Sequence, residues 1–123
     1  MADKPESIRV AVPESFGPAF GEGEDRQWVE RKVYIGRKVK TELSDLLEGF
    51  DYAENLAFDR LCEIFSTLFT AWKLMDEAGE PLPEPWENPK AFEALADASL
   101  DLFLWLSRVI HTPLGMLIVV PKN

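Results

Sequence analysis

The chain has 123 residues, of which 46% are hydrophobic and 11% aromatic, and its formal net charge is -9. This length fits one domain with a single core, and this apolar content excludes a chain that is disordered throughout. No apolar run reaches the roughly 20 residues that span a bilayer, and the first residues lack the apolar centre of a signal peptide, so we expect a cytosolic protein without a membrane segment.

The charge is distributed unevenly along the chain. Residues 1–25 carry six acidic and two basic groups, residues 26–40 carry one and six, and residues 41–123 carry fifteen and five. Most of the surface should repel phosphate groups, and we expect no nucleic-acid partner. The basic side chains, which include Arg31 and Arg37, could face an acidic partner or form the solvated face of a strand, and the sequence leaves both readings open.

The N-terminal part has the pattern of a strand followed by a flexible arm. Ile8, Val10 and Val12 alternate with other side chains, and residues 17–23 then contain three glycines and a proline. We therefore expect residues 1–25 to form a strand and a flexible arm that precede the main domain.

The main domain is expected to span residues 26–123 and to be largely helical. A second alternating segment predicts a half-buried strand that ends near Gly36. Residues 41–50 follow with four apolar side chains at helical spacing and predict a short helix, with Thr41 as its N-cap.

A long central helix is predicted over residues 52–75. Asp51 and Glu54 resemble a capping box at its start. The apolar residues that step by three and four along it are Phe58, Leu61, Phe65, Leu68, Trp72 and Met75. Their spacing places them on one buried helix face, and Gly79 with the prolines after it should end the helix.

A second helix should begin at Asn88 and Pro89, because asparagine caps well and proline is tolerated at the first helical position. We expect Asp97 to Ser99 to bend or restart it, and the part that follows is apolar on more than one side. This surplus either lies between other elements or contacts another chain. The candidate partner-binding residues are Leu100, Phe103, Leu104, Trp105 and Ile110. Residues 114–120 form a second apolar run, which predicts a closing strand or an adhesive tail.

The sequence contains no convincing arrangement of catalytic, metal-binding or cofactor-binding residues. His111 is the only histidine, and no nucleophile motif accompanies it, so we expect a structural role near a helix end. Cys62 is the only cysteine and is expected to be a buried thiol. Asp76 and its acidic neighbours match no calcium loop, and Gly21 and Gly23 match no phosphate loop. We therefore expect neither an enzyme nor a bound metal or cofactor.

The turn after the long helix carries the most specific pattern. It comprises Trp72, Leu74, Asp76, Glu77, Gly79, Pro81, Leu82 and Pro83. Together with the valine-rich and basic segment that starts at Trp28 and the leucine-rich helix up to Ile110, this turn resembles the tail assembly chaperones of long-tailed bacteriophages. The resemblance covers about two thirds of the chain, and the N-terminal arm and the tail over residues 114–120 depart from it.

The resemblance implies a mainly helical α+β fold with a long central helix, a second apolar helix and a small N-terminal strand element. It also implies a non-catalytic protein of the host cytoplasm that coats the tape measure protein before tail tube subunits polymerise around it, and that is absent from the mature virion. Two alternatives stay open: a small oligomerising phage structural or connector protein, and an acidic inhibitor or adaptor whose binding to a basic protein should weaken with salt.

Overall fold

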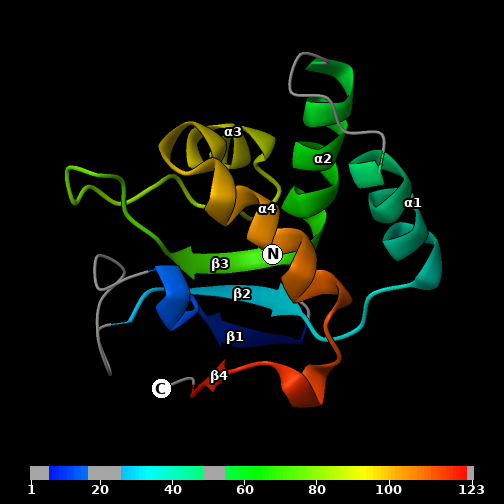
Figure 1. The fold of residues 1–123 in the computed structure, drawn as a ribbon, viewed down its shortest axis with the longest axis horizontal. Helices are drawn as coiled ribbons and strands as arrows, with labels where there is room; N and C mark the ends of the chain where they lie inside the picture. Colours follow the sequence, from blue (N-terminus) through cyan, green and yellow to red (C-terminus); the bar gives the residue numbers. More distant parts are fainter. Residues whose placement is uncertain (1–5, 17–25, 49–54, 122–123) are drawn as a thin grey trace, which may run out of the picture.

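The computed structural model describes residues 6–16, 26–48 and 55–121. In these residues the chain forms four α-helices and a four-stranded antiparallel sheet (Figure 1). The helices are α1 (Arg37–Glu48), α2 (Asn55–Leu68), α3 (Pro89–Ala98) and α4 (Leu100–His111), the strands are β1 (Ser7–Ala11), β2 (Trp28–Lys32), β3 (Phe69–Lys73) and β4 (Val119–Val120), and the short 3-10 helices are η1 (Glu14–Phe16) and η4 (Leu114–Met116). The predicted α+β class is confirmed.

The strands lie in the order β3-β2-β1-β4, and each neighbouring pair is antiparallel. The strand predicted around Ile8 is confirmed as β1, which is an inner strand because it pairs with both β2 and β4. The second predicted strand is β2 and ends at Lys32, four residues before Gly36. The predicted arm over residues 17–25 lies outside the described residues.

One face of the sheet is buried by the helices. Val10 lies opposite Val29, which lies opposite Trp72, and all three side chains are in the core. Because side chains alternate along a strand, the adjacent row, which contains Arg9 and Glu30, points to the other face. This alternation is typical of an antiparallel sheet with one covered face.

An aromatic cluster joins the helices to the covered face. The ring of Phe92 in α3 lies 6.0 Å from that of Phe69 and 5.0 Å from that of Trp72, both in β3. Phe65 in α2 lies 5.8 Å from Phe92 and 5.4 Å from Phe103 in α4. The cluster therefore links three helices to one strand at the centre of the core.

The predicted long central helix is wrong. The helix α2 ends at Leu68, and the chain continues as β3, which pairs with β2. An irregularity in this pairing between Glu30 and Arg31 brings both Phe69 and Trp72 to the covered face. The four-residue spacing between the buried side chains Leu68 and Trp72 is typical of a helix, but a helix end followed by a bulged strand buries the same two side chains. The proposed capping box at Asp51 and Glu54 lies outside the described residues.

The connection from β3 to α3 runs alongside β3. The amide of Leu82 donates to the carbonyl of Leu74 just after the strand, and the amide of Glu87 donates to the carbonyl of Ser66 just before it. The segment between them contains Pro83 and Pro85, which have no amide hydrogen and cannot extend the sheet. Gly79 turns the chain with a φ of 80°, as its predicted left-handed conformation requires.

The predicted starts of the helices are partly correct. α3 begins at Pro89 after Asn88, but the side-chain amide of Asn88 donates to the backbone carbonyl of Glu84 and does not cap the helix. Ser99 separates α3 from α4, and its hydroxyl accepts a hydrogen bond from the amide of Leu102. α1 begins at Arg37, so Thr41 lies inside the helix and is not its N-cap.

The substitution Phe92→Ala should lower the free energy of unfolding by about 3–5 kcal/mol, because it leaves a cavity between α2, α3 and β3. Urea denaturation followed by circular dichroism measures this loss. Tyr34→Ala serves as the control, since that side chain is 80% exposed and its loss should change stability by less than about 0.5 kcal/mol. Equal effects of the two substitutions would contradict the central position of the cluster.

Candidate functional site

Three of the five predicted partner-binding residues lie in the core. Phe103, Trp105 and Ile110 are buried, Leu104 is half-buried, and Leu100 is exposed. The reason is that α4 packs against α3, α1 and the sheet, so that these elements cover its apolar sides. Of the two readings of this helix, the structure supports a location between other elements, and the five side chains do not form one surface.

Most of the exposed apolar side chains lie instead in two other segments, the connection between β2 and α1 and the segment after α4. Among the described residues, the large apolar side chains that are at least one third exposed are Tyr34, Met75, Leu100, Leu114, Met116, Ile118 and Val119. Five of these seven come from the connection between β2 and α1 and from the segment after α4. The predicted closing strand is present as β4, and the segment before it is the exposed apolar tail.

A pocket of about 370 Å³ lies where these two segments meet. We call it the Tyr34 pocket. It is lined by Arg31, Val33, Tyr34, Ile35, Gly36, Lys40, Thr112, Pro113 and Leu114. One wall is the connection from β2 to α1, and the other follows the end of α4. Because both walls contribute apolar side chains, a pocket of this size can accept one or two large apolar side chains of a partner.

The charge around the Tyr34 pocket is positive, although the protein as a whole is acidic. Arg31 and Lys40 line it, no acidic residue does, and Arg37 and Lys38 lie exposed in the first turn of α1. His111, the last residue of α4, lies near this cluster: burial lowers its pKa, and the positive charge of Lys40 lowers the pKa further. The pocket therefore combines apolar side chains with positive charge, which Lys40 contributes at its rim and Arg31 at its base.

Arg31 has a structural role at the base of this pocket. Its side chain is buried, and it donates to three backbone carbonyls, from Nε to Lys32 at 2.7 Å, from Nη1 to Val109 at 2.9 Å and from Nη2 to Val33 at 3.1 Å. Burial lowers its pKa, but an arginine keeps its charge at neutral pH. The Val109 carbonyl lies in the last turn of α4, where carbonyls lack partners within the helix, and the hydrogen bond from Arg31 satisfies it and fixes that end of the helix beside β2.

The uncovered face of the sheet carries a polar and aromatic group that was not predicted from the sequence. The guanidinium of Arg9 lies 4.1 Å from the centre of the Trp28 ring and 3.2 Å from a carboxylate oxygen of Glu30. The hydroxyl of Thr70 donates to the other oxygen of that carboxylate at 2.9 Å. The carboxylate of Glu30 is thus ion-paired and hydrogen-bonded within this face, which offsets the cost of burying it.

Asp76 stabilises the turn after β3. One oxygen of Asp76 accepts hydrogen bonds from the amides of Ala78 at 2.9 Å and Glu80 at 3.0 Å. In the part of the chain that the structure describes, no group of three or more histidine, cysteine or acidic side chains could hold a metal ion.

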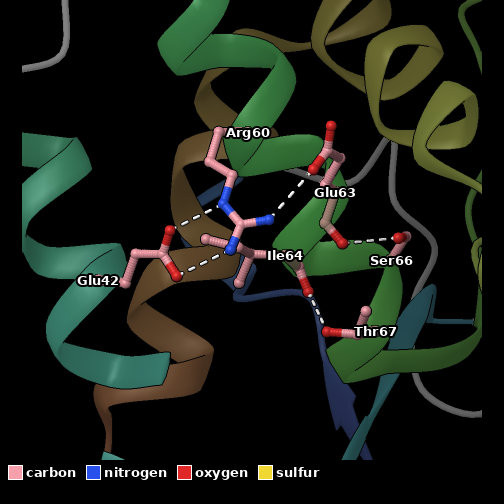
Figure 2. A network of polar contacts seen from close by, with 6 residues as sticks. All are labelled: Glu42, Arg60, Glu63, Ile64, Ser66 and Thr67. Atoms are coloured by element: carbon pink, nitrogen blue, oxygen red, sulfur yellow. Dashed lines mark hydrogen bonds and ion pairs between the residues drawn. The ribbon is translucent and has the colours of Figure 1, made fainter. Parts of the chain in front are cut away.

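Figure 2 shows the polar network that joins α1 to α2. Arg60 donates to both carboxylate oxygens of Glu42, at 2.7 and 3.0 Å, and to Glu63 at 3.1 Å. These contacts raise the pKa of Arg60 and lower that of Glu42. All three side chains are exposed, so the network orients the two helices and contributes little to stability.

Comparison with known proteins identifies no relative, since no family model, no curated protein and no solved structure matches this chain. None of the described helices is both long and apolar enough to cross a membrane.

The Tyr34 pocket could not be predicted from the sequence, because its two walls are far apart in the chain: Tyr34 and Leu114, for example, are separated by 80 positions. A weak signal is present, since Tyr34 and Ile35 lie just before a glycine, and Leu114 lies just after a proline. Such positions favour connections, where large apolar side chains are often exposed for binding.

The substitution Arg31→Lys should lower the free energy of unfolding by about 2–4 kcal/mol, because an ammonium group cannot reach all three carbonyls and would leave buried acceptors unpaired. Urea denaturation measures the effect. The matched control is Arg37→Lys, where the side chain is exposed and the change should be below about 0.5 kcal/mol. A tolerated Arg31→Lys would mean that the guanidinium does not hold α4 against β2.

The predicted buried thiol is confirmed, since Cys62 is 1% exposed. Burial raises its pKa from 9.0 to about 12, and the charges of Glu93 and Asp59 add to this. The native thiol should therefore react slowly with Ellman's reagent and rapidly in urea. The neutral thiol is favoured in the folded state, so its contribution to stability should be complete below pH 9 and should be lost as the pH rises toward 12. The free energy of unfolding of the unmodified chain and of Cys62→Ala should be measured across this pH range. The difference between the two should change as the pH rises, and a difference that is independent of pH would contradict the prediction.

Proposed function

We propose that this chain is a non-catalytic tail assembly chaperone of a long-tailed phage, which binds the tape measure protein and keeps it soluble during tail morphogenesis. The proposal takes its identity from the resemblance in the turn from Trp72 to Pro83. The observation that carries it is the exposed apolar surface at the Tyr34 pocket, which gives a small, acidic protein a place to hold an apolar client.

The pocket favours a particular kind of client segment. Val33, Tyr34, Ile35 and Leu114 offer apolar contacts, which suits one or two large side chains from the apolar face of an amphipathic helix. The cations on the rim favour acidic residues beside those anchors. Each contact would be weak, but many copies along one long client would bind it through multivalency.

The turn that carries the resemblance has a different role from the pocket. β3 is antiparallel to β2, so the turn after β3 lies at the opposite end of the sheet from the segment after β2 that forms the pocket. We infer that the turn is a structural feature, which directs the proline-containing segment along β3, and that client binding occurs at the other end.

This function places the protein in the cytoplasm of the infected host and outside the mature virion. Its principal partner would be the tape measure protein, and the tail tube protein that later replaces it on this client would be a second partner. A small oligomerising structural protein is the second candidate, and the exposed strand β4 favours it. Mass spectrometry of purified particles separates the two, because only a structural subunit should be present.

Co-expression with the tape measure protein encoded beside it tests the proposed function. The chain should raise the soluble fraction of the tape measure protein several-fold, and the double variant Tyr34→Asp with Leu114→Asp should lose this effect, because the two carboxylates would make the pocket polar. The double variant should still fold, since both side chains are exposed.

The matched control is the double variant Met75→Asp with Leu100→Asp, which adds the same charge at two exposed apolar positions outside the pocket. It should keep the full effect on solubility. Equal solubility of the tape measure protein with and without the chain would refute the chaperone, and equal activity of the two double variants would refute the pocket as the client site.

A further inference from the structure

The two edges of the sheet are protected differently. Along β3, the segment from Leu82 to Glu87 is hydrogen-bonded to the chain at both ends of the strand and contains prolines, which prevents another strand from pairing there. β4 forms the other edge, and its only strand partner among the described residues is β1. β4 has only two residues, so its free edge can pair with a strand of another chain over a short stretch.

The hydrogen-bond pattern shows which backbone groups of β4 are directed outward. The amide of Ala11 donates to the carbonyl of Ile118 at 3.0 Å, so Ile118 is a position that faces β1. Val119 lies opposite Val10, and the positions of an antiparallel ladder alternate between inward and outward. The amide and carbonyl of Val119 therefore point away from the sheet.

The chemistry of this edge suits a second copy of the same chain. Ile118 is 65% exposed and Val119 is 51% exposed. No side chain from Leu102 to Asn123 is acidic, so the side chains of β4 and of the segment before it add no negative charge. Most surfaces of a protein with a net charge of -9 repel their copies, and this edge lacks the groups that cause the repulsion.

We propose that two copies of the chain associate through antiparallel pairing of their β4 strands, with a twofold axis at Val119. In this arrangement, the amide of each Val119 donates to the carbonyl of Val119 in the other copy, which gives two equivalent hydrogen bonds. Ile118 of each copy lies opposite Val120 of the other on the uncovered face of the sheet, where the two side chains pack together.

The extent of the pairing predicts a weak dimer. Pro121 has no amide hydrogen, and the amide of Leu117 already donates to Leu114, so the ladder cannot lengthen. Outside the Tyr34 pocket, the exposed apolar side chains of this segment are Met116, Ile118 and Val119. At on the order of 100 Å² each, these three side chains from each of the two copies would bury about 600 Å² in total. This is below the roughly 1,200 Å² of stable interfaces, so the dimer should be reversible at micromolar concentrations.

Sedimentation velocity over a range of concentrations tests the proposal. The unmodified chain should shift from monomer to dimer as its concentration rises. Val119→Lys should raise the dissociation constant by at least about tenfold, because two ammonium groups would meet at the axis. Met75→Lys is the matched control, since it adds the same charge at an exposed methionine beyond the opposite edge and should dimerise normally.

Val119→Pro tests the backbone contact itself. It removes only the outward amide hydrogen, because the bonds to β1 are made by the neighbouring positions, and it should also give a monomer. In the unmodified chain, hydrogen exchange at the Val119 amide should become slower as the protein concentration rises. This measurement does not depend on whether a variant folds correctly.

The proposal is overturned if the unmodified chain stays monomeric at the highest concentration, if Val119→Lys dimerises as tightly as Met75→Lys, or if exchange at Val119 is independent of concentration. The dimer is independent of the proposed chaperone function, because the Tyr34 pocket does not include β4. A chaperone that stays monomeric would overturn only the dimer, and a dimer that does not solubilise the tape measure protein would overturn only the chaperone.

Discussion

The fold depends on the packing of Phe65 and Phe92 against one face of β3. These rings hold α2 and α3 on the sheet, and Phe103 extends the same contact to α4. Because the helices cover one face of the sheet in this way, the apolar sides of α4 are mostly buried within the molecule. A helix that is apolar on several sides is explained by its neighbours and needs no partner.

Arg31 connects this core to the candidate site. Its guanidinium is held by carbonyls from the end of β2 and from the last turn of α4, so the two chain segments that leave those elements start side by side. The Tyr34 pocket forms between them. A buried charge with three hydrogen bonds thus positions an exposed apolar surface, and the positive charge of the pocket follows from the same basic segment of the sequence.

The turn that resembles the phage chaperones also has a structural role, which is to protect the β3 edge of the sheet. Gly79 and Asp76 form a tight turn, and the prolines that follow lie where another strand would otherwise pair with β3. The residue pattern of this turn is therefore explained by the local fold, and we expect partners to bind at other parts of the surface. The pocket lies at the end of the sheet that is opposite this turn, and β4 lies at the edge that the prolines do not protect.

The sequence by itself determined the features that depend on near neighbours. Alternation around Ile8 gave a strand, Pro89 and Ser99 marked the limits of α3, and apolar surroundings predicted the burial of Cys62. Only the tertiary structure decided whether the segment after Leu68 continues as helix or as strand, because its spacing satisfies both and the partner strand β2 supplies the hydrogen bonds. It also decided which apolar residues are exposed. Hydrophobicity measures the gain from burial, whereas exposure depends on which distant segments arrive to cover a side chain, as they do for Phe103 and do not for Tyr34.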